Sequence, residues 1–248
     1  MQAWQEMAQK VGQGDAKEIR GLILYLVCLA DGLYWEKDEE GAKTLHRLLV
    51  GLEKKGFDVL SWLQMRADSA KDDMERDESH FALALIYGYG LLGTIDLNQA
   101  KNYLVEVTNP VFKGPIHYFE AVFLESSREQ VYFEVVEKYK ESLKYWDSSQ
   151  VLYRLSLYLF HNLNSDEDLL ECLDYAHLAS VNGHAKACEL LGRIYLHAEE
   201  LVSAWAWYWI AMQKGNETIR EDWLKLEDRV TSEERVRAKL LVEEFLST

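Results

Sequence analysis

The chain has 248 residues and carries 42 Asp and Glu against 27 Lys and Arg, a formal net charge of −15 at pH 7. Nucleic acid and anionic membranes would repel such a chain, which argues against both as partners and favours a basic protein. Many proteins have an acidic surface only because it keeps them soluble. The prediction that the partner is basic rests on the net charge alone. The two prolines, Pro110 and Pro115, are predicted to fall between helices, which is typical of an all-α fold.

Residues 1–75 are predicted to form an N-terminal helical region with a degenerate repeat or an irregular cap. Glycines separate the expected helices, which cover 1–13, 15–34, 38–55 and 57–70. The spacing of small residues in this region departs from that of the rest of the chain, because Ala42 and Ala100 are 58 positions apart.

The three cysteines are an odd number, which indicates free and buried thiols in a reducing compartment. The polar N-terminal segment has no apolar core before a cleavage site, so no secretory signal is expected. The longest apolar run, 22–30, is shorter than the 18–20 residues or so that a membrane span needs. Together these features predict a cytoplasmic protein.

Residues 76–217 repeat at a spacing of 36. Counting back from Leu191 and Tyr195 in steps of 36 always reaches a large apolar residue: Leu155, Phe119 and Leu83, then Leu159, Phe123 and Tyr87. A small-residue position follows the same step through Ala100, Val136 and Cys172, and reaches Ala204 after 32. This pattern predicts helical hairpins that bury their apolar faces by stacking on one another.

A finer pattern lies inside each repeat. Three triplets share one spacing: Gly90, Asp96 and Ala100; Gly32, Asp38 and Ala42; Asn162, Asp168 and Cys172. Gly or Asn suits a left-handed residue that ends the first helix, and Asp caps the second helix. The small third residue lets the two helices approach closely, as Gly192 and Ala204 are expected to do beside Tyr195 and Tyr208.

These motifs resemble the Sel-one-like repeat family, a relative of the tetratricopeptide repeat. The resemblance covers roughly residues 80–246 well and 20–56 weakly; residues 119–143 keep only the apolar skeleton. It implies a right-handed superhelical α-solenoid of stacked antiparallel helix pairs that binds other proteins, and it implies no common reaction. Residues 218–248 would be capping helices of one continuous superhelix, with a last helix that turns Val236, Leu240, Leu241 and Phe245 inward.

In stacked helix pairs the first helix of each repeat lines the concave face, so its exposed positions predict a groove. The predicted groove is rich in aromatic and His side chains and contains three charged groups: Phe81, Tyr89, His117, Tyr153, Phe160, His161, Lys186, Glu189, Arg193 and His197. Aromatic residues at these positions favour an apolar or aromatic peptide as the ligand. The alternative is that neighbouring helices cover several of them.

Two other clusters have competing interpretations. Trp205, Trp207, Tyr208 and Trp209 surround one helix turn. At least one of Trp207 and Trp209 should be partly exposed, which would mark an interface or the seat of a C-terminal helix around Trp223; packing is the plainer explanation. Cys172, His177, His184 and Cys188 are spaced by five, seven and four, unlike the tight pairs of zinc sites. No metal or cofactor is therefore expected.

The sequence has no phosphate-binding loop after a strand, no nucleophile elbow and no His-Glu-x-x-His motif, so an enzyme is not expected. We expect a protein–protein interaction scaffold or adaptor that binds a protein or peptide in the concave groove. The alternative is an immunity or chaperone-like protein that neutralises a toxin or effector. A repeat-fold enzyme or metalloprotein is the third, disfavoured interpretation. The oligomeric state stays open.

Overall fold

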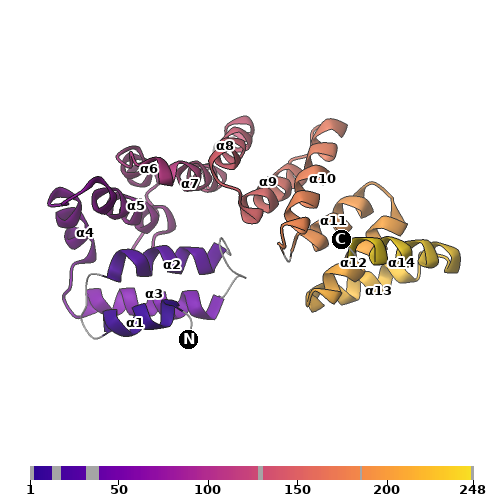
Figure 1. Ribbon diagram of the computed structural model, residues 1–248, viewed down its shortest axis with the longest axis horizontal. Coiled ribbons are helices and arrows are strands. Elements are labelled where there is room, and N and C mark those ends of the chain that lie inside the picture. Colours follow the sequence, from indigo (N-terminus) through magenta and orange to yellow (C-terminus); the bar gives the residue numbers. More distant parts are fainter. Residues whose placement is uncertain (1–2, 13–17, 32–38, 128–130, 185, 247–248) are drawn as a thin grey trace. The chain divides into compact units, whose positions relative to one another are not determined.

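The computed structural model describes residues 3–12, 18–31, 39–127, 131–184 and 186–246. Within these ranges the protein contains fourteen α-helices, packed as consecutive pairs, and no strand, so the predicted all-α class is confirmed (Figure 1). The chain divides into two compact units, residues 1–146 and 147–248. The right-handed superhelix and the division into 1–75, 76–217 and 218–248 stay predictions.

The first unit contains eight helices. They are α1 (Ala3–Gly12), α2 (Ile19–Asp31), α3 (Glu39–Lys54), α4 (Val59–Asp68), α5 (Asp73–Tyr89), α6 (Leu97–Val105), α7 (Lys113–Glu125) and α8 (Tyr132–Tyr145). Helix α2 packs on α3, α4 and α6 pack on α5, and α7 packs on α8. The four helices predicted for the N-terminal region therefore form. Helix α2 also contacts α5, where Arg20 donates to the backbone oxygen of Glu75 at 3.0 Å.

Local signals in the sequence explain how the helices of the first unit end and begin. Gly90 ends α5 in the left-handed region, at φ 61°, which suits a residue without a Cβ. Asp96 then accepts hydrogen bonds from the backbone N–H groups of Asn98 and Gln99, as an N-cap does. Both predicted roles are confirmed at this repeat. Gly32 and Asp38 of the second triplet lie outside the described residues. In the third triplet both predictions were wrong, because Asn162 ends α9 at φ −125° and Ser165, not Asp168, is the N-cap of α10.

The prolines lie somewhat differently from the prediction. Pro110 begins a short 3₁₀ turn, Pro110–Phe112, between α6 and α7, as expected. Pro115 lies inside the first turn of α7 and not between helices, so that part of the prediction was wrong. The first turn of a helix tolerates proline because its N–H groups have no partner within the helix.

The second unit contains six helices. They are α9 (Ser149–His161), α10 (Asp166–Val181), α11 (Ala187–His197), α12 (Leu201–Gln213), α13 (Arg220–Glu227) and α14 (Ser232–Leu246). Helix α9 packs on α10 and α11 on α12, while α13 and α14 both pack on α12. The close approach predicted at Gly192 is confirmed, since a Cβ there would lie 2.2 Å from Cδ1 of Tyr208.

A reciprocal pair of hydrogen bonds joins α9 to α10. The hydroxyl of Ser156 donates to the backbone oxygen of Cys172 at 2.8 Å, and the thiol of Cys172 donates to the backbone oxygen of Ser156 at 3.2 Å. Both side chains are buried, and burial raises the pKa of Cys172 to about 11. Cys172 therefore occupies the small packed position that the repeat pattern predicted, as a neutral thiol.

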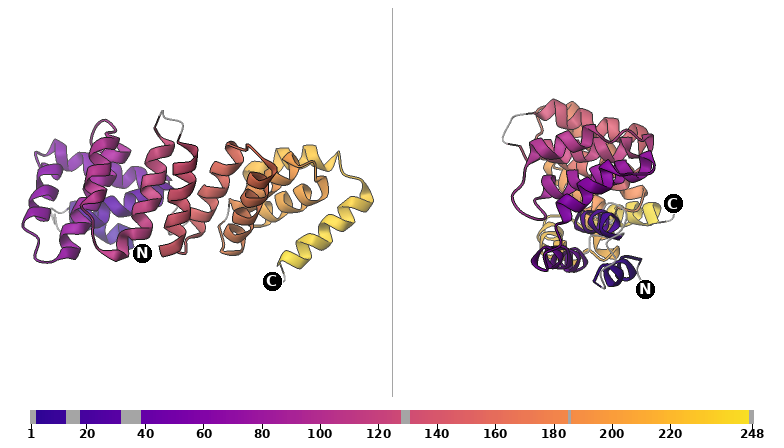
Figure 2. Two further views of the ribbon diagram at one scale, coloured as in Figure 1. Left: turned by 90° about the horizontal axis from the view of Figure 1, so that it is seen from above. Right: turned by 90° about the vertical axis from the view of Figure 1, so that its left-hand side faces the viewer.

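Helix α14 buries a different face from the predicted one. Figure 2 shows α14 as a single helix that leads to the C-terminal end. Among the side chains of α14 whose burial is described, Ala238 and Val242 are buried, whereas Val236 and Leu240 are 60% and 59% exposed. The prediction that Val236 and Leu240 face inward was therefore wrong, whereas Phe245 packs on Trp207 of α12 as predicted, and Leu241 is partly exposed but turned towards α12. Apolar residues lie on several sides of this helix, and the side that carries Ala238 and Val242 meets α12.

Candidate functional site

The residues predicted to line a groove lie in both units, and those of the first unit are partly buried. Phe81 is only 3% exposed, with its ring 5.2 Å from that of Phe112 and 5.5 Å from that of Phe119. Its prediction as an exposed groove residue was wrong, because the 3₁₀ turn after α6 brings Phe112 against it. Tyr89 is half-buried and packs edge-on against Phe119. His117 is half-buried, with Nδ1 3.0 Å from Oε2 of Glu120.

The predicted residues of the second unit lie on α9 and α11, except Lys186, which immediately precedes α11. Phe160 meets His197 edge-on at 5.9 Å, and Glu189 forms an ion pair with Arg193. Tyr153 stacks on His184 with ring centroids 4.1 Å apart. Burial raises the pKa of Tyr153, and the Glu189 carboxylate raises it further. The exposed members are His161, Lys186, Arg193 and His197. The structure brings these seven of the ten predicted residues together on one unit; their binding role stays a prediction.

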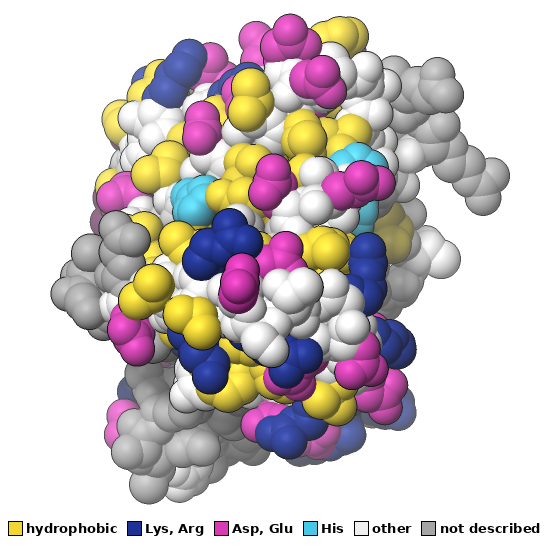
Figure 3. All heavy atoms as spheres, turned by 90° about the vertical axis from the view of Figure 1, so that its right-hand side faces the viewer, with side chains coloured by type: hydrophobic (Ala, Val, Ile, Leu, Met, Phe, Trp, Pro, Cys, Tyr) yellow, Lys and Arg dark blue, Asp and Glu magenta, His cyan; other side chains and the backbone are white. Residues whose placement is uncertain are grey.

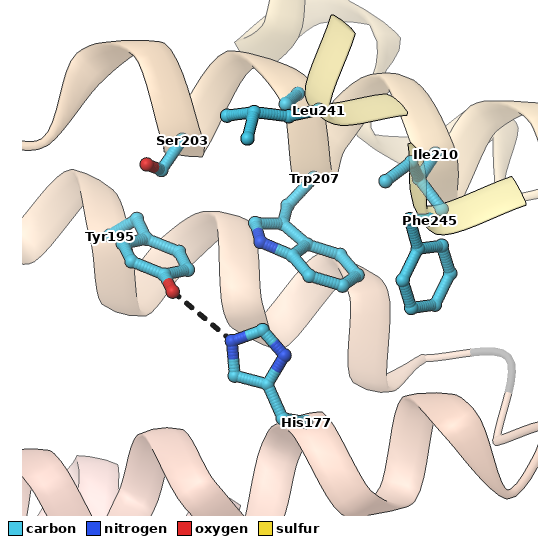
Figure 4. Close-up of a pocket in the computed structure, with 8 residues that line it drawn as sticks. His177, Tyr195, Ser203, Trp207, Ile210, Leu241 and Phe245 are labelled. Atoms are coloured by element: carbon cyan, nitrogen blue, oxygen red, sulfur yellow. Dashed lines mark hydrogen bonds between the residues drawn. The ribbon is translucent and has the colours of Figure 1, made fainter. Parts of the chain in front are cut away.

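A cavity of about 340 Å³ lies elsewhere in the second unit, between α10, α11, α12 and α14. Eight residues line it: His177, Tyr195, Ser203, Ala206, Trp207, Ile210, Leu241 and Phe245 (Figure 4). We refer to this cavity as the α14 pocket. None of the ten predicted groove residues lines it, so the α14 pocket is a candidate site that the sequence analysis missed.

One edge of the α14 pocket is polar. Nε2 of His177 lies 3.1 Å from the hydroxyl of Tyr195, a hydrogen bond whose donor depends on the tautomer of the imidazole (Figure 4). Burial lowers the pKa of His177, against the opposing effect of Asp174. Burial also raises the pKa of Tyr195, and Glu200 raises it further. Both side chains are therefore neutral at pH 7.

The opposite edge of the α14 pocket is apolar. The ring of Phe245 meets Trp207 at 4.7 Å in an edge-to-face arrangement, and the His177 ring also meets Trp207 edge-to-face, at 5.0 Å. Leu241 is 43% exposed and opens this lining to solvent. Lys214 places its ammonium 5.4 Å from the Phe245 ring. In Figure 4 Phe245 and Ile210 lie at one end of the pocket, and Tyr195 and Ser203 at the other.

Exposed apolar side chains adjoin the pocket in sequence. Leu178 follows His177 on α10 and is exposed, as is Leu240 beside Leu241 on α14. Figure 3 shows the face on the right-hand side of Figure 1, where hydrophobic side chains lie among acidic side chains, basic side chains and histidines. An apolar recess with exposed aliphatic neighbours and a few polar groups is the usual composition of a ligand-binding site.

The tryptophan cluster was the sequence signal nearest to this pocket. Trp209 is partly exposed, as predicted for at least one of the pair, and stacks on Trp205 at 5.6 Å. Trp223 of α13 contacts both rings, at 5.3 and 5.1 Å. Trp207 receives Phe245 of α14. The cluster is thus the seat of both C-terminal helices, and the α14 pocket is the space that one of them leaves open.

Three further observations bear on chemistry. Within the described ranges, no group of three or more His, Cys, Asp or Glu is arranged to hold a metal ion. Cys28, Cys172 and Cys188 are buried and form no disulfide. None of the helices that the structure describes is long and apolar enough to cross a membrane.

No protein-family model and no curated protein matches this chain. Among solved structures, the chain is similar to the crystal structure of a Sel1 repeat protein from Oxalobacter formigenes. The identity is 16%, the match covers 97% of this chain and 99% of that chain, and the TM-score is 0.48. The match is to a protein of the repeat type that the sequence motifs resemble.

Proposed function

We propose that this chain binds other proteins and that the α14 pocket receives an apolar side chain of the partner. The observation that carries the proposal is an apolar cavity of about 340 Å³, open beside Leu241 and closed at one edge by the His177–Tyr195 hydrogen bond. Ligand pockets span about 300–1,000 Å³, and this cavity is at the small end, which suits a side chain better than a large ligand. The resemblance to Sel-one-like repeats, which bind proteins, supports the same function.

The proposal assigns binding and no catalysis to this chain. Two polar groups of the pocket are engaged with each other, since the His177 imidazole is hydrogen-bonded to the Tyr195 hydroxyl. An interaction scaffold is the first form of the proposal. An immunity or chaperone-like role towards a basic toxin or effector is the second form, supported by the 18 acidic against 10 basic residues in residues 147–248. The buried thiols of Cys172 and Cys188 support a reducing compartment, and we propose the cytoplasm.

Peptide display on the full-length protein tests the pocket. Selected peptides should share a large apolar residue, and Leu241→Asp should abolish their binding because it places a charge at the apolar lining. Leu224→Asp is the matched control, since Leu224 lies on α13, is similarly exposed and does not line the pocket. Peptides that tolerate Leu241→Asp but lose binding in Tyr153→Ala with Phe160→Ala would place the site on α9 and α11 and refute the pocket.

A further inference from the structure

The α14 pocket has a carboxylate beside each of its two hydrogen-bonded polar groups. Asp174 is exposed and lies one turn before His177 on α10. Glu200 is exposed and immediately precedes α12, and its backbone N–H donates to the backbone oxygen of Tyr195 at 2.9 Å. The two charges also act on the pocket electrostatically, Asp174 on the His177 imidazole and Glu200 on the Tyr195 phenol. The polar edge of the pocket is therefore an acidic edge.

These carboxylates have no cationic partner within the part of the chain that the structure describes. Asp174 and Glu200 make no ion pair there, and the same holds for the neighbouring Glu199. The contrast with other acidic residues beside aromatic groups is clear. Glu189, beside Tyr153, pairs with Arg193, and Glu120, beside His117, pairs with Lys138. The acidic edge is thus the part of the pocket where a cation from another molecule would find uncompensated charge.

The opposite end of the pocket carries the reverse charge. Lys214 lies over the ring of Phe245. Figure 4 shows Phe245 at the end of the pocket away from Tyr195 and Ser203. A ligand with a cation and an apolar group side by side would therefore be oriented, with its cation towards Asp174 and Glu200. Charged groups arranged in this way raise the association rate and set the register of a complex more than they raise its affinity.

We propose that the α14 pocket binds a segment of a basic protein in which a large apolar side chain has Lys or Arg as a close neighbour. The apolar side chain enters the pocket and the cation lies at the acidic edge; this inference rests on the proposed function. A second copy of the chain is a poor occupant, because each copy carries a formal charge of −15 and would repel the other. A segment rich in Asp or Glu is disfavoured for the same reason.

The expected size of the charge effect follows from exposure. Both carboxylates are exposed, so each ion pair contributes modestly, and two of them together correspond to roughly a three- to tenfold gain in affinity. Salt screens exposed pairs, with a Debye length of about 10 Å at 0.1 M ionic strength, so the gain must shrink as salt rises. The apolar contribution of the pocket should persist at the same salt.

Three fluorescein-labelled peptides test the proposal against the full-length protein by fluorescence anisotropy. The first has one Trp flanked by two Lys, the second has the same Trp flanked by two Glu, and the third has Ala in place of Trp with the two Lys. At low salt the Trp–Lys peptide should bind roughly three- to tenfold more tightly than the Trp–Glu peptide and should also exceed the Ala–Lys peptide. The preference for Lys should shrink at physiological salt.

A charge-neutral variant locates the effect. Asp174→Asn with Glu200→Gln should bring the Trp–Lys and Trp–Glu peptides to the same affinity. Asp147→Asn with Glu221→Gln is the matched control, because it removes the same two charges from exposed positions elsewhere in the second unit and should preserve the preference. Leu241→Asp should abolish binding of both Trp peptides.

The outcomes separate the two proposals. Equal binding of the Trp–Lys and Trp–Glu peptides to the unmodified protein overturns the acidic-edge inference and leaves the apolar pocket standing. A preference for Lys that survives Asp174→Asn with Glu200→Gln also overturns the inference, since net charge alone then explains it. Equal binding of the Ala–Lys and Trp–Lys peptides, or no binding of any Trp peptide, overturns both the inference and the proposed use of the pocket.

Discussion

Replacement of Gly192 by Ala tests the helix contact at the centre of the second unit. The new Cβ would lie 2.2 Å and 2.4 Å from two ring carbons of Tyr208. Carbon atoms in contact prefer about 3.5–4.0 Å, so the ring or the helix must move by roughly 1.3 Å or more. Tyr208 is buried, and its ring has little room to move.

The magnitude is a balance of two opposing effects. Overpacking of a filled core costs about 1–3 kcal/mol, and a displacement of this size in a buried ring belongs to the upper half of that range. Replacing a glycine inside a helix by alanine returns up to about 1 kcal/mol through backbone entropy. We therefore expect Gly192→Ala to lower the free energy of unfolding of the second unit by about 1–2 kcal/mol.

Gly51 supplies the matched control. It also lies inside a helix, α3, but a Cβ there would have no atom within 4 Å. Gly51→Ala should therefore stabilise the first unit by about 0.5–1 kcal/mol through the backbone alone. Urea unfolding followed by circular dichroism, with hydrogen exchange measured on peptides from each unit, assigns each change to its unit.

A double variant decides whether the contact itself is responsible. In a Tyr208→Leu background the ring atoms that Gly192→Ala would strike are absent, so the added methyl group should cost little or become neutral. An equal loss of stability with and without the Tyr208 ring would refute the proposed contact between these two residues.

Three further predictions follow from single residues. Asp77 is buried and accepts from the backbone N–H groups of Thr108 and Asn109 at 2.8 and 2.6 Å; desolvation raises its pKa, but those N–H groups and Arg76 outweigh this and hold the pKa below its ordinary value. A carboxyl group whose pKa is lowered by folding stabilises the folded state at pH values above its unfolded pKa of about 3.9. This stabilisation is lost as the pH falls through the folded-state pKa. Asp77→Asn should therefore destabilise the first unit by about 1–3 kcal/mol at pH 7 and by less below pH 4, and an identical loss in urea midpoints at both pH values would contradict this. Glu199 follows the end of α11 with φ 61°, a left-handed conformation that glycines, Gly183 and Gly215, adopt after α10 and α12. Glu199→Gly should therefore stabilise the second unit by about 0.5–1 kcal/mol. An unchanged thermal midpoint would exclude backbone strain at Glu199. His177 should titrate below the ordinary histidine value in NMR spectra because it is buried, and a pKa at or above 6.5 would show that the α14 pocket is more hydrated than the structure indicates.

The local features of the fold could be predicted from sequence because neighbouring residues determine them. Gly90 and Asp96 act within one helix end and one helix start, and their chemistry needs no partner from elsewhere in the chain. Gly192 and Tyr208 required one further step, the repeat, which places them in facing helices of one pair. The all-helical class follows from the same periodic pattern.

The functional surface could not be predicted in the same way. Phe81 is covered by Phe112, which arrives through an irregular turn that the repeat pattern does not specify. Apolar residues lie on several sides of α14, so hydrophobicity alone did not show that Ala238 and Val242 are buried. The α14 pocket is the space between four helices, and its lining residues are spread along the sequence from His177 to Phe245. No sequence pattern specifies a space of this kind.

The reciprocal Ser156–Cys172 hydrogen bonds place a thiol inside the hairpin of α9 and α10, so its reactivity reports on the opening of this hairpin. A neutral, buried thiol with a pKa of about 11 reacts with alkylating reagents only when its helices separate. Cys188 reports in the same way on α11, and Cys28 on α2 of the first unit. The alkylation rates of the three thiols therefore measure how often α2, the α9–α10 hairpin and α11 open locally, without an added probe.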